Sequence, residues 1–285
     1  MTLVVEETGP LALLQDRGRP GHGHLGVSPS GAFDRTALRQ VNLLLGNQPD
    51  AAALELLGGG LVLRAEDSVL VAVTGAVGPI TIDGDPVAYG RAVSLRPGRR
   101  LRLGAPTGSL RTYVGVAGGF VVAHELGSAS TDTLAGLGPG PVVAGDRLVT
   151  GPRLPTPDLE DLPALGHAGD LVLDVAVGPR DDWFTAAAVR SLLESAWQVS
   201  PTSSRVGVRL TGPRLVRSRT DELPSEPCLR GSIQVSADGQ PIVLGPDHPV
   251  TGGYPVIAVV LDRHTDRLAQ AQPGRIIRFR GVSLP

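Results

Sequence analysis

The chain has 285 residues, a formal net charge of −2 at pH 7, and a composition that is 41% hydrophobic and 19% charged. These values are typical of a soluble globular protein with one large core or two ordinary ones. The balanced charge leaves no electrostatic footprint for nucleic acid or for an acidic membrane. All 26 basic residues are arginine, which excludes a Schiff-base lysine, a lysine general base and a P-loop lysine.

The cysteine content and the apolar runs indicate the compartment in which the protein is found. The single cysteine, Cys228, excludes an internal disulfide and a thiolate zinc cluster. The N-terminus lacks a basic region followed by an apolar stretch and a cleavage site, and the longest strand-like apolar run, residues 256–261, is far too short to span a bilayer. We therefore expect a cytoplasmic location.

The first half of the chain is predicted to be rich in strands after one early helix. Asp34 is a favoured N-cap for a helix over residues 35–45, whose apolar residues share one stripe. The 38 glycines and 25 prolines fall at turn positions, which favours many short strands. Apolar or alternating runs predict these strands at residues 67–75, 80–88, 100–104 and 112–120, with a hairpin turn at Asp83 and Gly84.

The second half of the chain is also predicted to be rich in strands, with one helix. Thr185 is a candidate N-cap for a helix over residues 186–197. Strands are predicted at residues 171–178, 205–210, 232–244 and 275–281. Residues 153–166 are polar and proline-rich, and we expect them to link two subdomains, residues 1–152 and residues 167–285.

Two short signatures recur in the same order. Residues 83–87 read DGDPV and precede PGRRLRLG at 97–104, and residues 238–243 read DGQPIV and precede PGRIIRFRG at 273–281. Either the halves share a repeated unit, with an insertion in the second copy that contains residues 247–255, or similar hairpins arose by chance.

The glycine-rich stretch QDRGRPGHGHLGVSPSGAFD, residues 15–34, is rich in polar donors and acceptors. Five glycines and two prolines preclude a helix, so the backbone is predicted to form turns with many available N–H groups. Arg17 and Arg19 offer donors suited to a carboxylate or a phosphate. Orienting polar groups come from Gln15, Asp16, Ser28, Ser30 and Asp34. The alternative is a solvated connection with ordinary caps.

Two motifs inside this stretch lack the context that their chemistry requires. Residues 26–30 read GVSPS, which is not a nucleophile elbow, because the fifth position is Ser30 and no strand leads into it. His22 and His24 have a spacing compatible with metal ligation but no clear third ligand, so we predict no metal site.

Residues 247–255, DHPVTGGYP, combine an acid, an imidazole and a phenol with two glycines. Gly252 and Gly253 let the backbone approach a ligand, and Tyr254 adds a donor. Asp247 is a candidate base or orienting group and His248 a candidate proton shuttle. The alternative is a strand-connecting turn in which Asp247 acts as an Asx cap.

Glu55 is an acidic residue within an apolar stretch, and two interpretations of it are open. Glu55 lies in AALELLGG, and it is either an exposed charge at a helix end or a buried acid.

Taken together, these stretches resemble the allophanate hydrolase subunit 2 family, which includes the C subunit of 5-oxoprolinase and the matching part of urea carboxylase. The resemblance covers nearly the whole chain. It rests on residues 15–34, NLLLGNQPDAAALEL at 42–56, SSRVGVRLTG at 203–212 and GSIQVSADGQPIVLGPDHPVTGGYPVIAVV at 231–260. The family usually has an arginine where this chain has Ala129, so one expected guanidinium is missing.

The resemblance implies a mainly β fold with two cyclophilin-like β-barrel subdomains and a few short helices. It also implies the C subunit of an ATP-dependent 5-oxoprolinase, which opens the lactam of 5-oxoproline to glutamate. The partners would be a relative of the B subunit, of the allophanate hydrolase subunit 1 type, and a relative of the A subunit. We expect this chain to have little lactam-opening activity alone.

On the matched motifs, we expect catalytic roles for Asp247, His248 and Asp16. We expect substrate or anion binding by Gln15, Arg17, Arg19, Ser28, Ser30, Asp34, Gly252, Gly253 and Tyr254. Neither the 15–34 stretch nor the 247–255 stretch is complete by itself, so we expect the two to converge on one cleft.

Two other functions remain open. One is carboxyl transfer from carboxybiotin, as in the urea carboxylase relatives. Because the chain has no lysine that could carry biotin, the carrier would be another polypeptide. The other is a non-catalytic subunit that binds and regulates its partner.

Overall fold

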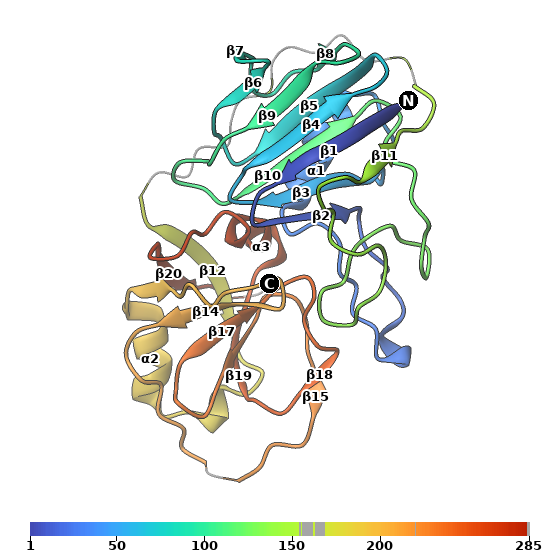
Figure 1. The fold of residues 1–285 in the computed structure, drawn as a ribbon. Helices are drawn as coiled ribbons and strands as arrows, with labels where there is room; N and C mark the ends of the chain where they lie inside the picture. The colour runs from blue at the N-terminus through green and yellow to red at the C-terminus, as the bar shows by residue number, and fades with distance from the viewer. Residues whose placement is uncertain (154, 156–161, 163–168, 220, 284–285) are drawn as a thin grey trace. The chain divides into compact units, whose positions relative to one another are not determined.

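A computed structural model describes residues 1–153, 155, 162, 169–219 and 221–283, and the chain divides into two compact units (Figure 1). The first comprises Met1–Arg19, Ser30–Asp132 and Gly136–His167; the second comprises Pro20–Pro29, Thr133–Ala135 and Ala168–Pro285. Two short segments from the N-terminal half therefore belong to the second unit. The expected linker, residues 153–166, lies almost entirely outside the described residues, so the domain boundaries stay a prediction.

The mainly β prediction is confirmed in both units. The elements of the first unit are β1 (Thr2–Thr8), β2 (Leu11–Gln15), α1 (Arg35–Leu44), β3 (Ala53–Leu57), β4 (Leu61–Ala65), β5 (Val69–Gly75), β6 (Ile80–Ile82), β7 (Asp85–Pro86), β8 (Val93–Leu95), β9 (Arg100–Leu103), β10 (Arg111–Val116) and β11 (Arg147–Val149). Those of the second are η1 (Gly23–Leu25), β12 (Leu171–Val177), η2 (Asp181–Trp183), α2 (Ala186–Glu194), β13 (Trp197–Val199), β14 (Gly207–Thr211), β15 (Glu226–Pro227), β16 (Ser232–Val235), β17 (Pro241–Leu244), β18 (Thr251–Gly252), β19 (Val256–Val260), α3 (Asp262–Leu268) and β20 (Ile276–Gly281).

Two antiparallel sheets enclose the core of the first unit. Their strand orders are β11-β1-β4-β9-β6-β7 and β2-β3-β10-β5-β8. Side chains of both sheets, among them Leu63, Leu101 and Val114, belong to one buried hydrophobic cluster. Strand β9 has its leucines in this cluster and its arginines exposed, as the alternation in its sequence predicts.

Strand β10 is buried along its whole length because it has neighbours on both faces. Val114 packs in the shared core, whereas Tyr113 packs with α1. Gly115 permits the close approach of the helix, since a Cβ there would lie 2.8 Å from Leu45 and 2.9 Å from Val41. The uninterrupted apolar run in this part of the sequence thus reflects burial on two faces.

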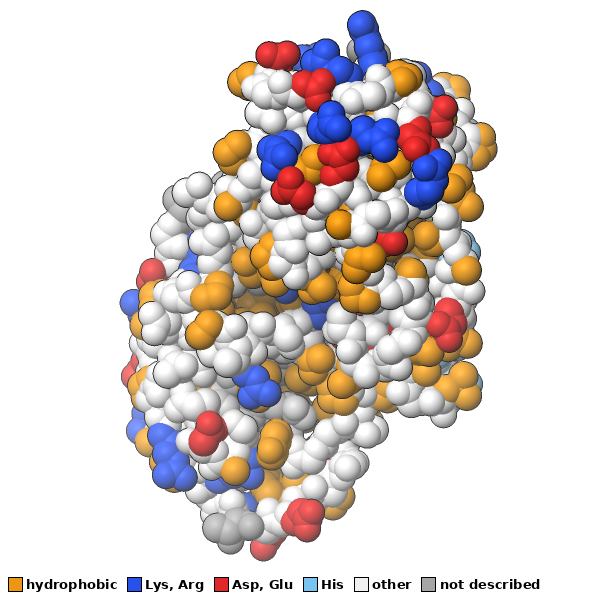
Figure 2. Space-filling model, viewed as in Figure 1, with side chains coloured by type: hydrophobic (Ala, Val, Ile, Leu, Met, Phe, Trp, Pro, Cys, Tyr) orange, Lys and Arg blue, Asp and Glu red, His pale blue; other side chains and the backbone are white. Residues whose placement is uncertain are grey.

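Opposite charges cover the outer face of the sheet formed by β1, β4 and β9, where red and blue side chains intermingle in Figure 2. Glu6 on β1 accepts from Arg64 on β4 at 3.0 Å and from Arg100 on β9 at 2.8 Å. Exposed pairs of this kind contribute little to stability, because water screens the charges. This face is therefore a solvated surface.

The second unit is built on a closed barrel with the strand order β12-β19-β16-β17-β14-β13-β20. Strands β12 and β20 pair in parallel, and the other pairs are antiparallel. Inward-facing Leu173, Ile233, Ile257 and Ile277 are fully buried. The barrel expected for this half of the chain is present.

Helix α2 is shorter than predicted. Thr185 caps it as expected, accepting from the N–H of Ala188 at 3.1 Å, but the helix ends at Glu194. Ser195 is extended and Trp197 begins β13, where its indole N–H donates to the Leu192 carbonyl oxygen at 3.0 Å. The helical spacing of apolar residues continues into the strand by chance, so the prediction of a helix to residue 197 is wrong at its end.

The two hairpins that suggested a repeat have different strand partners. In the first unit β6 pairs with β9. In the second unit β20 pairs with β12 and β13, and none of its described pairings involves β16 or β17. The recurring residues reflect similar turns and not a repeated topology.

Candidate functional site

The loop between β17 and β19, in the second unit, is anchored by Asp247. Its side chain is fully buried and forms an ion pair with Arg205, which is 3% exposed. Arg205 Nε donates to Oδ2 and Nη2 donates to Oδ1, each at 2.9 Å. Thr133 donates to Oδ2 twice, from its backbone N–H at 2.9 Å and from its hydroxyl at 2.7 Å. Four donors thus converge on this carboxylate.

These donors decide the protonation state of Asp247. Burial by itself raises the pKa of the carboxyl, but the charge of Arg205 and the hydrogen bonds from Arg205 and Thr133 outweigh it and hold the pKa below its usual range. A carboxylate with a lowered pKa and four donors is a poor general base near neutral pH. Its contacts are those of an anchor for the loop.

The next residue, His248, is oriented by a backbone carbonyl. Its Nδ1 lies 2.9 Å from the carbonyl oxygen of Pro249. Because that oxygen can only accept, we assign the ring proton to Nδ1, which makes Nε2 the basic nitrogen. The side chain is buried, and it lines a pocket.

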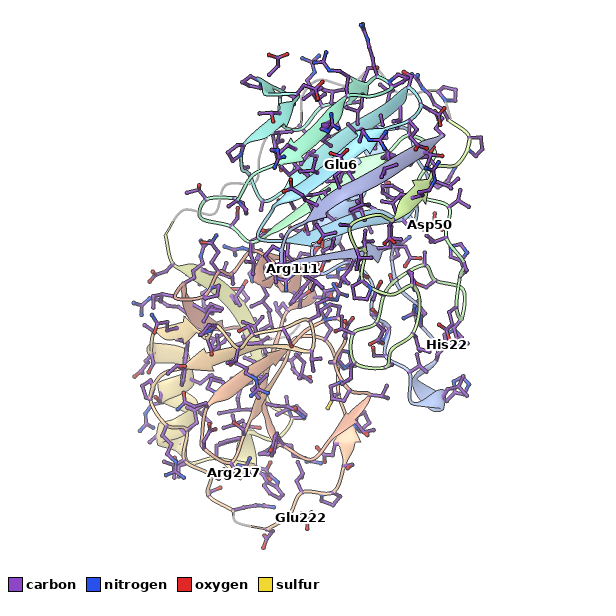
Figure 3. The ribbon with its side chains drawn as sticks, in the orientation of Figure 1. Glu6, His22, Asp50, Arg111, Arg217 and Glu222 are labelled. Atoms are coloured by element: carbon purple, nitrogen blue, oxygen red, sulfur yellow. The ribbon has the colours of Figure 1, made fainter. Side chains whose placement is uncertain are left out.

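This pocket has a volume of about 920 Å³ and lies within the second unit. The glycine-rich segment contributes Gly21, Gly23 and Pro29 to its lining, and the loop after β17 contributes His248 and Val250. Figure 3 shows His22 on the same segment, beside η1. The middle of the glycine-rich stretch and the 247–255 stretch therefore meet at one pocket.

The remaining walls of the pocket are mostly apolar. They come from the ends of β12 and β19 and from the segment around Leu229. Polar groups are few, and among the described lining residues they include Cys228, Arg230 and Asp262. Burial raises the pKa of the Cys228 thiol, as does the nearby Glu226, so the sulfur stays protonated near neutral pH. Such a pocket, apolar with a few polar groups, is typical of small-molecule sites.

Of the two glycines of the 247–255 stretch, Gly252 lies on a short two-stranded ribbon and Gly253 follows it. Gly252 pairs with Glu226 where β18 meets β15, and a Cβ there would lie 2.6 Å from the side-chain nitrogen of Gln234. Gly253 is exposed. The ring of Tyr254 is 45% exposed and lies 5.8 Å from the guanidinium of Arg217, which is labelled in Figure 3. None of these side chains is among the described residues that line the pocket.

The beginning of the glycine-rich stretch belongs to the first unit, where Asp16 anchors it. Its Oδ1 accepts from the N–H of Gly18 at 2.7 Å and from the hydroxyls of Ser128 and Ser130 at 2.6 and 2.5 Å. Its Oδ2 accepts from the N–H of Ala129 at 2.7 Å. Asp16, like Asp247, is a buried carboxylate that holds two loops together.

Gln15 and Arg19 are buried, and the hydrogen bonds of the described residues use only some of their polar side-chain atoms. Gln15 donates to the carbonyl oxygen of Thr131 at 2.8 Å, and Arg19 donates to those of Glu125 and Ser130. Gln15 Oε1 and Arg19 Nη1 have no hydrogen-bond partner among the described residues. A buried guanidinium with an unused donor suits an anion or an ordered water.

The other expected site residues take varied positions. Ser30 has a positive φ of 52° and donates to the Thr131 carbonyl oxygen at 3.3 Å. Asp34 caps α1 as predicted, accepting from the N–H of Ala37 at 2.9 Å. Ser28 is buried and belongs to the second unit, and Arg17 is exposed in the first. A cleft shared by Arg17 and Asp247, which belong to different units, stays a prediction.

Glu55 is a buried acid on β3, so its interpretation as an exposed charge at a helix end is wrong. Tyr113 donates to its Oε2 at 2.5 Å, and the N–H of Phe33 donates to the same oxygen at 2.8 Å. The N–H of Asp34 donates to the Tyr113 hydroxyl at 2.7 Å. Burial, with the charges of Glu55 and Asp34, raises the pKa of Tyr113 well above its usual value, so the phenol remains a donor. This network fixes the end of the glycine-rich stretch.

Within the described residues, no group of three or more His, Cys, Asp and Glu is arranged to hold a metal ion. Over that same part of the chain, no helix is both long and apolar enough to cross a bilayer.

Sequence reasoning missed Arg205 and Thr133, which hold Asp247, and Arg230, which lines the pocket. Arg205 lies 42 positions from Asp247 and Thr133 lies 114 positions from it. No local pattern joins residues so far apart. The conspicuous acid at position 247 was a signal that a buried cation should be sought.

The fold belongs to a known class. Residues 25–281 match the carboxyltransferase domain family, subdomain A and B, and the chain belongs to this family. The chain is similar to the C subunit of 5-oxoprolinase from Escherichia coli (strain K12), with 37% identity across 99% of this chain and 92% of that protein. It is also similar to the 5-oxoprolinase C subunit of Haemophilus influenzae, with 36% identity across 96% and 89%.

Solved structures agree with this assignment. TTHA0988 has a TM-score of 0.90 and 34% identity over 98% of this chain. The urea amidolyase of K. lactis has a TM-score of 0.92 and 28% identity over 99% of this chain. The chain spans 55% of the TTHA0988 chain and 19% of the amidolyase chain. The resemblance inferred from the motifs is confirmed.

Proposed function

We propose that this chain is the C subunit of a multi-subunit, ATP-dependent 5-oxoprolinase that opens the lactam of 5-oxoproline to give glutamate. The observation that carries this proposal is the extent of similarity to two proteins named as the C subunit of 5-oxoprolinase, of which 92% and 89% are covered. In the urea amidolyases of Lachancea kluyveri and Saccharomyces cerevisiae, the matching region is only 17% and 16% of the protein.

In this proposal the pocket of the second unit holds the reacting amide. Opening the lactam breaks the ring C–N bond, places a water oxygen on the carbonyl carbon and returns a proton to the nitrogen. His248, with a basic Nε2, takes the proton from water and delivers it to the leaving nitrogen. Charge that develops on the carbonyl oxygen needs fixed donors, which we assign to the backbone amides near Gly21 and Gly23.

The other expected residues take two kinds of role in the proposal. Asp16 and Asp247 act as anchors, because their carboxylates are already occupied by donors. The proposed substrate or anion ligands are Gln15, Arg17, Arg19, Ser28, Ser30, Asp34, Gly252, Gly253 and Tyr254. Of these, Arg19 has the strongest physical support, since its buried guanidinium has an unused donor.

ATP, in such an enzyme, would supply a phosphoryl group that activates the amide carbonyl carbon toward attack by water. The pocket does not fit a triphosphate: Arg230 is the one arginine among its described lining residues, and it pairs with Asp266 at 3.1 Å. We therefore assign ATP binding to a partner protein of the assembly. The proposed partners are a relative of the A subunit and a relative of the B subunit, the latter of the allophanate hydrolase subunit 1 type, and the proposed location of the assembly is the cytoplasm.

Reconstitution tests this proposal directly. The purified chain is mixed with the relatives of the A and B subunits, and glutamate release from 5-oxoproline is measured with and without ATP. We expect ATP-dependent release from the complete mixture and little or none from the chain alone or from the mixture lacking it. Full activity without this chain, or robust activity of the isolated chain, contradicts the proposal.

A second candidate function is carboxyl transfer, which the similarity to urea amidolyase favours. Biotin would then be carried by a lysine of another polypeptide, since this chain has none. Urea and a carboxybiotinylated carrier protein replace 5-oxoproline and ATP in the same assay. Carboxylation of urea without glutamate release would favour this alternative. Modulation of a partner that turns over without the chain would favour a regulatory role.

A further inference from the structure

We propose that Thr133, acting with Arg205, is a positioning residue for His248. The two residues clamp the Asp247 carboxylate and thereby fix the imidazole that follows it in the chain. Neither Thr133 nor Arg205 is among the described residues that line the pocket, so their effect on the reaction passes through the loop. The catalytic part of this inference rests on the proposed function, whereas the clamp can be measured without it.

The clamp joins three stretches that are far apart in the sequence but belong to one unit. Thr133 lies in the Thr133–Ala135 segment, Arg205 precedes β14, and Asp247 follows β17. The backbone is fixed as well, because the N–H of Asp247 donates to the carbonyl oxygen of Arg205 at 3.2 Å. Both the main chain and the side chain of Asp247 are therefore held in one orientation.

The immobility of Asp247 is transmitted to His248 through a single peptide unit. That unit is planar and keeps successive Cα atoms about 3.8 Å apart, so a change at Asp247 re-aims the imidazole. His248 makes its own contact with Pro249 O, but that contact lies on the same loop and moves with it. The donors that hold Asp247 thus help to fix the position of the imidazole in the pocket.

Thr133 offers a cleaner test of the clamp than Arg205. Removing Arg205 would leave a buried carboxylate without its counter-charge, which is expected to unfold the barrel. Thr133 is exposed, and Thr133→Val keeps its shape and its backbone N–H while removing the hydroxyl donor. Thr133→Ser retains the hydroxyl. Thr202→Val, at another exposed threonine of the second unit, is the matched control.

In the reconstituted enzyme, we expect Thr133→Val to lower kcat by about 10-fold to 100-fold, the scale of a misplaced catalytic group. The KM for ATP should stay unchanged, because the nucleotide is assigned elsewhere. Thr133→Ser should recover most of the rate, and Thr202→Val should match the wild-type enzyme. A wild-type kcat for Thr133→Val in a stably folded complex would overturn the inference.

A spectroscopic measurement on the isolated full chain tests the clamp even if the assembly has another activity. The ring nitrogens of the six histidines are labelled with ¹⁵N, and the His248 signals are identified by their loss in His248→Gln. We expect the wild-type and Thr133→Ser chains to show the Nδ1–H tautomer, and Thr133→Val to shift the His248 signals. Identical His248 signals in wild type and Thr133→Val would refute the clamp. Absent lactam opening by the wild-type complex would instead refute the proposed function.

Discussion

Asp247 combines complete burial with four donors, one pair of which carries the charge of Arg205. In Asp247→Asn the side chain keeps its shape, but the buried guanidinium loses its counter-charge. We expect the free energy of unfolding to fall by about 3–5 kcal/mol, the usual loss when one partner of a buried pair is removed. Urea unfolding of the full chain measures this change.

The control for this prediction is Asp170→Asn. Asp170 pairs with Arg278 at 2.8 Å, but both side chains are close to half exposed. Removal of that pair should cost no more than about 1 kcal/mol. Equal losses for the two variants would mean that Asp247 acts as an ordinary turn residue.

The lowered pKa of Asp247 predicts how the stability of the protein depends on pH. The folded state holds the carboxyl ionised below its ordinary pKa of about 4, so the unfolded state binds more protons in that range. The stabilisation is fully present above the ordinary pKa and is lost as the pH falls through the folded pKa. The difference in unfolding free energy between wild type and Asp247→Asn should therefore stay level down to about pH 5 and shrink as the pH falls towards about pH 3. A constant difference would contradict the ion-pair account.

At the residue scale, the sequence predicts what depends on near neighbours. Asp34 and Thr185 are identifiable as helix caps because a cap acts within three residues. Asp247 and His248 stand out by their chemistry, but the partners that decide the role of Asp247 lie far along the chain. Burial and charge pairing, which separate an anchor from a base, are tertiary properties.

At the scale of elements, the network around Glu55 ties the start of α1 to β3 and β10. Tyr113→Phe removes a donor to the buried Glu55 carboxylate and an acceptor for the N–H of Asp34. We expect a loss of about 1–3 kcal/mol in unfolding free energy, because a buried hydrogen bond to a carboxylate and a backbone hydrogen bond are both removed. Chemical unfolding measures it.

Tyr89→Phe is the matched control for this prediction. Its hydroxyl is half-buried and donates to the carbonyl oxygen of Gly75 at 2.9 Å. Loss of that neutral bond should cost about 0.5–1.5 kcal/mol. A smaller loss for Tyr113→Phe than for Tyr89→Phe would argue against a stabilising network at Glu55.

The elements that the sequence predicts are those whose pattern of apolar and polar residues matches the burial of their faces. Strands β5 and β10 follow from continuous apolar runs, and β9 follows from alternation. Strand β13 was missed because Trp197 continues the helical spacing of α2. Strand β3 was missed because Glu55, an acid, occupies a position buried on both sides by neighbouring strands.

At the scale of the whole molecule, composition and motif order were sufficient for the mainly β class and the family. They were insufficient for the assignment of residues 20–29 and 133–135 to the second unit. That assignment follows from long-range contacts, such as those between Thr133 and Asp247, which leave no periodic signal in the sequence. The motifs predict that residues 15–34 and 247–255 converge, but they do not show that only residues 21–29 of the first stretch contribute to the pocket.

In the proposed mechanism, the pocket that contains His248 carries the proton transfer of lactam opening in the assembled enzyme. The most direct measurement is glutamate release by the reconstituted complex with His248→Gln, alongside His124→Gln at an exposed histidine of the first unit. We predict a fall in kcat of at least about 100-fold for His248→Gln, the scale of a lost general acid–base group, with assembly and Tm retained. His124→Gln should keep the wild-type rate. Near-normal turnover by a stably assembled His248→Gln complex would contradict the claim.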